Sequence, residues 1–229
     1  MKIKIFLILL LAVSFYSVNC SKKNPLGPAT PNTISDNYIP LGMGYTRQYN
    51  NYSLSNTKFD TTTYSEITFR GIAPNKKTYY ELDEKTKTPS GTITDSDVLY
   101  IRKDSTGYYQ YDPFEVGADA EALIIKLPLV KGSSWTALNY SGSIGHTAGN
   151  ISINIVNSYI ADETITNGAD TFVCVKIKTD WNYTITLDTG AISESHSGTS
   201  YDWYANNVGK VKSQDEDGYS LLSSYTIHL

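Results

Sequence analysis

The feature that most constrains the fold of this chain is the alternation of large apolar side chains with small polar ones in several stretches. Apolar or aromatic residues occupy every second position at 151–155, 181–187 and 219–229, with one serine among them. Successive side chains of a β-strand point to opposite faces of a sheet, so a period of two is typical of strands with one buried face. No helical period of 3.6 residues persists beyond residue 37, which favours an all-β or mainly β domain.

Turn residues and composition favour the same fold class. The chain has 19 tyrosines and many Thr, Val and Ile residues, which are common in strands. Asn167-Gly168 lies between two β-rich stretches and predicts a tight hairpin, while 104–107, 188–190 and 215–218 resemble further connectors. We therefore expect roughly ten to twelve strands in an antiparallel curved sheet that forms a half-barrel, a barrel or a sandwich.

The amino terminus has the pattern of a secretory signal peptide over residues 1–19. Two lysines precede an apolar run at 5–13, which is too short for a transmembrane helix of about 20 residues. Cys20 follows, in the position of the lipid-modified cysteine of bacterial lipoproteins, and we expect it to carry the lipid. The alternative is ordinary cleavage after Ser14, which would leave Cys20 as an unmodified thiol.

The segment after this cysteine reads as a tether. Residues 20–36 are polar, rich in proline and unpatterned, as expected for a chain that cannot bury enough apolar surface to fold. We assign 37–229 to a single β-rich domain, in which Cys174 is the only other cysteine, so no internal disulfide is expected. Loss of the two lysines of the signal peptide changes the formal net charge from −4 to −6, which argues against nucleic acid as a partner.

Four short segments together resemble motifs of an uncharacterised family of bacterial lipoproteins. They resemble, in order, the patterns PLxxGxxWxY, LPLxxGxxW, AGTFxCxxV and WYAxGVGxVK. In this chain they stand at 38–49, 127–135, 168–177 and 201–212. Arg47 or Tyr45 occupies the place of the usual tryptophan in the first pattern, and Asn207 replaces a glycine in the last.

This family is loosely similar to the LolA-like half-barrels, which bind lipid or lipoprotein in the periplasm. The resemblance implies a β-rich protein attached to the cell envelope by its N-terminal lipid, with a lipid or protein ligand. Ser21 after the cysteine, rather than an aspartate, favours the outer membrane. No cofactor is implied.

Residues that could support catalysis or bind a metal are few and scattered. The three histidines, His146, His196 and His228, have no second His or Cys at a spacing typical of zinc ligands. Ser143 lies in a Ser/Gly-rich stretch without the flanking glycine of a nucleophile elbow, and Cys174 lies between apolar neighbours. The acidic groups at 95–97 and 215–218 are candidates for calcium binding, but the second lacks the ligand spacing of an EF-hand loop and acidic hairpin tips are normally solvated turns.

We therefore expect no catalytic residue and no metal site, and we predict a protein that binds rather than catalyses. Tyrosines on neighbouring strands and a tryptophan are our candidates for an aromatic binding surface, and they are Tyr79, Tyr108, Tyr111 and Trp203. The alternative function is a structural or adhesive surface module with no small-molecule site. A tunnel lined by apolar residues would favour the first function, and a filled core with a flat aromatic face would favour the second.

Overall fold

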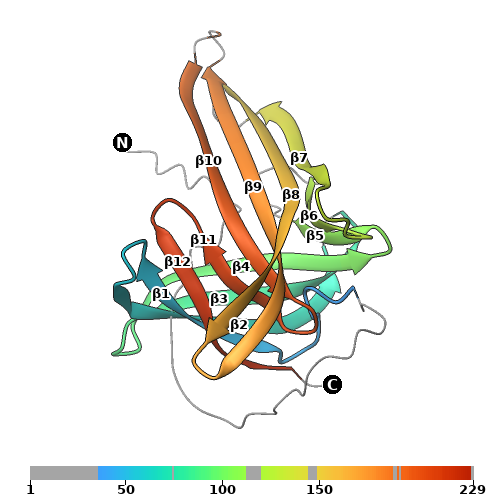
Figure 1. Ribbon diagram of the computed structural model, residues 1–229. Coiled ribbons are helices and arrows are strands. Elements are labelled where there is room, and N and C mark those ends of the chain that lie inside the picture. The colour runs from blue at the N-terminus through green and yellow to red at the C-terminus, as the bar shows by residue number, and fades with distance from the viewer. Residues whose placement is uncertain are drawn as a thin grey trace.

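The computed structural model describes residues 36–73, 75–111, 120–143, 149–187, 190 and 192–227. These residues form twelve strands and no helix (Figure 1), which confirms the predicted fold class. The strands are β1 (Thr46–Ser53), β2 (Lys58–Ile72), β3 (Thr78–Lys87), β4 (Ile93–Asp104), β5 (Gly107–Tyr111), β6 (Glu121–Lys126), β7 (Ser134–Ser143), β8 (Gly149–Asn167), β9 (Asp170–Leu187), β10 (Ile192–Ala205), β11 (Gly209–Gln214) and β12 (Gly218–Thr226).

All twelve strands belong to one antiparallel sheet, in the order β6-β5-β4-β3-β2-β1-β12-β11-β10-β9-β8-β7. Two runs of hairpins, β1–β6 and β7–β12, are joined by the pairing of the first strand with the last. The edge strands β6 and β7 follow each other in the sequence and are connected by the short segment 127–133. Because this segment holds the two edges of the sheet together, the sheet curls into a nearly closed barrel.

Side-chain hydrogen bonds, rather than a strand ladder, bridge the gap between the two edges. The indole Nε1 of Trp135 on β7 donates to the carbonyl oxygen of Leu123 on β6 at 2.8 Å. The amide nitrogen of Asn157 on β8 donates to the carbonyl oxygen of Ile124 at 3.0 Å. These bonds satisfy carbonyl groups on the edge strand β6, which lacks a strand partner on that side.

The segment that precedes β1 packs into the sheet and fastens its two halves. The carbonyl oxygen of Asp36 accepts hydrogen bonds from the Tyr108 hydroxyl at 2.8 Å and from Lys103. The carbonyl oxygen of Asn37 accepts from the backbone nitrogen of Asn207, in the β10–β11 turn, at 2.8 Å. Residues 36 and 37 therefore link β4 and β5 to the opposite side of the sheet.

The largest apolar cluster surrounds the same segment. Tyr38 and Ile39 are both 7% exposed and belong to a cluster whose other members come mainly from six strands, β5–β10. The other buried members are Tyr108, Ile125, Leu127, Trp135, Tyr159, Val175, Ile177 and Tyr204. All four sequence motifs supply residues to this cluster, so the physical role of the motifs is to close the sheet around Tyr38 and Ile39.

A second cluster holds the end of the β8–β9 hairpin against β10–β12. The hairpin curls over these strands (Figure 1), and Phe172 meets Tyr225 edge to face with ring centroids 6.2 Å apart. Cys174 and Trp203 are buried beneath it. The predicted turn at Asn167-Gly168 is confirmed, with Gly168 at φ = 62°, a conformation that glycine adopts readily.

Arg47 is buried among backbone groups at the point where the first and last motifs meet. It is 4% exposed, and its Nε and Nη2 atoms donate to the carbonyl oxygens of Val208 at 3.0 Å and Pro40 at 3.3 Å. The guanidinium lies against Gly209, where an added Cβ atom would stand 2.6 Å from Nε. Gly209 has φ = 103°, so this position combines a strained backbone conformation with no space for a side chain.

We predict that Gly209→Ala costs about 3 kcal/mol of unfolding free energy, because the methyl group strains the backbone and displaces Arg47 from its two carbonyl partners. Gly168→Ala is the matched control, since its φ is also positive but nothing lies within 4 Å of an added Cβ. The control should cost about 1 kcal/mol. Urea unfolding measures both values, and equal losses in the two variants would contradict the packing of Arg47 on Gly209.

Candidate functional site

One face of β7–β9 carries apolar side chains that the strand register places in rows. Ile155 lies opposite Trp181, Ile153 opposite Tyr183 and Ile151 opposite Ile185. We name the set of apolar residues on this face the apolar grid, which consists of Leu138, Tyr140, Ile151, Ile153, Ile155, Trp181, Tyr183 and Ile185.

The grid is partly covered. Ile155, Tyr183 and Ile185 are 5–6% exposed, whereas Ile153 and Trp181 keep more accessible surface. The end of the grid near β6 packs against Ala122 of that strand and Ala120 just before it. In Figure 1, β8–β10 rise beyond the rest of the sheet, and the far end of the grid lies on these projecting strands.

On the same face of the sheet, polar side chains begin at β10. The pairing of β10 with β9 runs without a register shift from Ser195 to Ala205, so Gly198, Ser200, Asp202 and Tyr204 share one face. Gly198 lies opposite Trp181 of the grid, whereas Ser200 and Asp202 begin a polar region. The inner face of the barrel is therefore apolar over the grid, whereas beyond β10 polar residues share it with buried apolar ones such as Tyr49 and Leu222.

The polar region continues in register across the centre of the sheet. Asp202 lies opposite Ser213, Ser213 opposite Ser220, and Ser220 opposite Asn51. Two further rows of paired residues run across β1–β3. One contains Arg47, Ser65 and Glu84, and the other contains Thr63 and Thr86. We name this set the inner polar patch, which consists of Arg47, Asn51, Thr63, Ser65, Glu84, Thr86, Ser200, Asp202, Lys210, Ser213 and Ser220.

Several polar atoms of the patch have no hydrogen-bond partner among the described residues. Both side-chain polar atoms of Asn51 are unpaired, as are the hydroxyls of Thr63 and Ser200 and the Oδ1 atom of Asp202. Asn51 and Thr63 are 0% exposed and Ser200 is 1% exposed. A buried polar group without a partner costs about 1–3 kcal/mol, and native proteins rarely leave one unsatisfied.

The charged groups of the patch face one another. Burial raises the pKa of Glu84, and the charges of Lys210 and Arg47 act against this rise. Lys210 Nζ lies 3.4 Å from Asp202 Oδ1, and the hydroxyl of Tyr204 donates to Asp202 Oδ2 at 3.2 Å. Positive and negative groups are thus present together, and the patch offers both donors and acceptors to a bound group.

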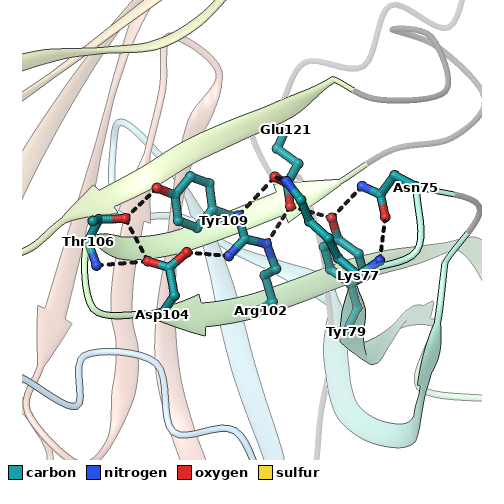
Figure 2. Close-up of polar contacts among 8 residues, drawn as sticks. All are labelled: Asn75, Lys77, Tyr79, Arg102, Asp104, Thr106, Tyr109 and Glu121. Atoms are coloured by element: carbon teal, nitrogen blue, oxygen red, sulfur yellow. Dashed lines mark hydrogen bonds and ion pairs between the residues drawn. The ribbon is translucent and has the colours of Figure 1, made fainter.

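Figure 2 shows a second polar network, which links β3–β6 around Glu121. The Glu121 carboxylate accepts from Lys77, from the Tyr79 hydroxyl and from Arg102, whose Nη2 atom lies 2.9 Å away. Burial alone would raise the pKa of Glu121, but these hydrogen bonds lower it to about 2.

Arg102 also pairs with Asp104 in this network and lies 3.9 Å from the ring centroid of Tyr109. Asp104 Oδ1 accepts from the backbone nitrogen of Thr106 at 2.8 Å. All the charged groups drawn in Figure 2 are therefore paired with one another, and we assign the network to holding the strands together rather than to chemistry.

The aromatic residues predicted to form a binding surface are buried in the structure. Tyr79 and Tyr111 are each 1% exposed and stack on each other with centroids 5.2 Å apart. Tyr108 is 0% exposed and belongs to the closing cluster, and Trp203 is 3% exposed and donates to Glu163 at 2.6 Å. They do not form an exposed aromatic surface here, because packing and hydrogen bonds cover them. Their contact with a ligand stays a prediction.

The residues that we considered for catalysis lie apart from one another. His196 is exposed on β10, with Nε2 2.9 Å from Glu194 Oε1 and its ring stacked on Tyr183. Cys174 is 1% exposed, and burial raises the pKa of its thiol to about 12, so it is not a reactive thiolate. Ser143 is exposed at the end of β7.

Other predicted positions fall in turns or outside the described residues. The Asp215 carboxylate accepts from the backbone nitrogens of residues 217 and 218 and so stabilises its own turn. Within the described ranges, no three metal-ligating side chains come together. Cys20, His146 and His228 lie outside the residues that the structure describes.

Comparisons with known proteins give one partial family match and two similar structures. Residues 138–227, which run from within β7 to the end of β12, match the DUF3108-like family model. A predicted lipoprotein of Parabacteroides distasonis has a similar structure, with 17% identity and a TM-score of 0.48 over 82% of this chain and 98% of that chain. A predicted exported protein of Bacteroides fragilis with a YmcC-like fold shows 15% identity and a TM-score of 0.47 over the same shares.

No curated protein matches the sequence significantly. Among the described residues, no helix is long and apolar enough to span a membrane. The family match covers the strands that carry the apolar grid and part of the inner polar patch. The relation to LolA-like half-barrels stays a prediction.

The network in Figure 2 predicts a loss of stability at acidic pH. Because the pKa of Glu121 is lowered from 4.5 to about 2, its ion pairs stabilise the fold above pH 4.5, and this contribution is lost as the pH falls toward 2. Glu121→Gln should cost about 2 kcal/mol at pH 7 and little at pH 2. Urea unfolding across this range measures the effect, with Glu216→Gln in an exposed turn as the control. A difference between wild type and Glu121→Gln that does not change with pH would contradict this role.

Proposed function

We propose that this chain is a lipid-anchored protein of the cell envelope that binds an apolar or amphipathic ligand on the inner face of its sheet and catalyses no reaction. Its location rests on residues 1–36, whose basic start, short apolar run, Cys20 and polar tether fit export followed by lipid attachment. A lipid anchor with two or more acyl chains gives stable attachment to a membrane.

The observation that carries the binding function is the division of the inner face into two parts. The apolar grid lies beside the inner polar patch on one continuous face, and β10 contributes to their boundary. An apolar surface next to convergent polar groups is the arrangement found in small-molecule sites. The unpaired atoms of Asn51, Thr63 and Ser200 support the same function, because a bound molecule would supply the partners that the protein does not.

The alternative function, a structural or adhesive surface module, is favoured by a ladder of rings and lysines on the opposite face of β9–β12 and β1. Tyr52 and Tyr219 stack with centroids 4.9 Å apart, and the Lys212 ammonium lies 4.8 Å from the Tyr219 ring and 4.5 Å from Trp203. Lys176 continues the ladder to Tyr201 at 5.0 Å. Such pairs stabilise a sheet and also give it a firm outer surface.

The anchor predicts that Cys20→Ser changes where the protein is found. The wild-type chain should sediment with membranes and take up labelled fatty acid, because acyl chains on Cys20 hold it there. The variant should be exported, remain soluble and take up no label. Fractionation and metabolic labelling measure both properties, and a labelled or membrane-bound Cys20→Ser protein would contradict the assignment of the lipid to this residue.

The binding function predicts that a molecule co-purifies with the protein. The full chain with Cys20→Ser, purified from the periplasm without detergent, should show an extra mass in native mass spectrometry that denaturation releases as an apolar or amphipathic compound. Ile153→Asn, within the grid, should reduce the occupied fraction several-fold. Ile160→Asn, which changes a 41% exposed residue of the same strand, should leave it unchanged. A clean apo mass that persists after incubation with envelope lipids would favour the surface module instead.

A further inference from the structure

We propose that the inner polar patch recognises a neutral, hydroxyl-rich group, a sugar or polyol, on the ligand whose apolar part lies on the grid. This inference rests on the proposed function and specifies the chemistry of the ligand's polar end. It is carried by the kinds of atom that the patch leaves unpaired and by the pairing of its charges.

The unpaired atoms require donors and acceptors together. Asn51 Nδ2 needs an acceptor, whereas Asn51 Oδ1 needs a donor. A hydroxyl group donates and accepts through one atom, so neighbouring hydroxyls satisfy both positions. An ionised phosphate offers acceptors alone and would leave the amide oxygen unsatisfied. An ammonium group offers donors alone and would leave the amide nitrogen unsatisfied. The free hydroxyls of Thr63 and Ser200 suit a polyol equally well, since each can donate or accept.

The charged groups of the patch are two cations, Arg47 and Lys210, and two carboxylates, Glu84 and Asp202, so their formal charges cancel. Lys210 Nζ lies 3.4 Å from Asp202 Oδ1. Burial raises the pKa of Glu84, and the charges of Lys210 and Arg47 act against this rise. A net charge on the ligand would therefore enter a buried region without a free counter-charge, whereas a neutral group would not.

The boundary between patch and grid provides an aromatic surface beside the hydroxyls. The Trp181 ring lies over Gly198, where an added Cβ would stand 2.5 Å from the ring. Ser200 is the next residue of β10 on the same face, so the indole and the unpaired serine hydroxyl are diagonal neighbours. A ring next to hydrogen-bonding groups suits a sugar, which has apolar C–H faces as well as hydroxyls.

The test compares amphiphiles that share one tail and differ in head group. The full chain carrying Cys20→Ser is titrated with octyl glucoside, octyl phosphate and octyltrimethylammonium below their micelle concentrations, with calorimetry as the readout. We expect the glucoside to bind at least tenfold more tightly than either charged compound. Asn51→Leu should abolish this preference and leave the affinity for octyl phosphate unchanged. Asn182→Leu, on an exposed position of β9, is the matched control and should keep the preference.

Folding of the variants is checked by thermal melting. Replacement of an unpaired buried amide by an apolar group of similar shape should not reduce stability. Ser200→Ala provides a second variant, for which we expect a several-fold loss of glucoside affinity. Equal binding of the three amphiphiles that Asn51→Leu does not alter would overturn the inference and leave the proposed function in place. Binding of none of them would contradict both.

Discussion

The whole structure depends on the contact between the segment before β1 and the two ends of the sheet. The edge strands β6 and β7 share no backbone ladder, so the barrel is closed by side chains. Tyr38 and Ile39 fill the space where β5–β10 converge, and the carbonyl groups of residues 36 and 37 are hydrogen-bonded to opposite halves of the sheet. Burial of apolar surface drives this closure, and the fixed carbonyls determine its register.

Closure of the sheet creates the inner face on which the proposed function rests. Once the edges meet, side chains on one face of every strand lose solvent, whether they are apolar or not. The grid residues gain from this burial, whereas Asn51, Thr63 and Ser200 lose their hydration without gaining protein partners. Native proteins rarely leave buried polar groups without partners, and we propose that a bound polar group supplies the missing hydrogen bonds. The fully paired network around Glu121 shows that the same chain satisfies its buried charges elsewhere.

Much of the fold could be predicted from the sequence, because its signals are local. The alternation of Trp181, Tyr183 and Ile185 with polar residues reports a strand with one buried face, and Asn167-Gly168 reports its hairpin. The pairing of the first strand with the last, and the edges at β6 and β7, depend on contacts distant in sequence. A single sequence carries no local signal for such contacts.

The candidate site was harder to predict, for a physical reason. In β12 the alternation marks Tyr219 and Leu221, yet the smaller Ser220 on the other face is the buried residue. Likewise, in the sequence Asn51 and Thr63 resemble ordinary polar residues that face solvent. Only the closed sheet shows that they are buried and unpaired. The tyrosines chosen as a binding surface have large apolar rings, and the same property that suited them to ligand contact placed them in the core.

The most direct test of this account is a crystal structure of the protein purified from its own envelope without detergent. The account predicts continuous density for a bound molecule on the inner face, with hydroxyl groups within hydrogen-bond distance of Asn51 and a chain along the grid near Trp181. An inner face with no ordered molecule, in which Asn51 and Thr63 are hydrogen-bonded to protein atoms alone, would contradict it.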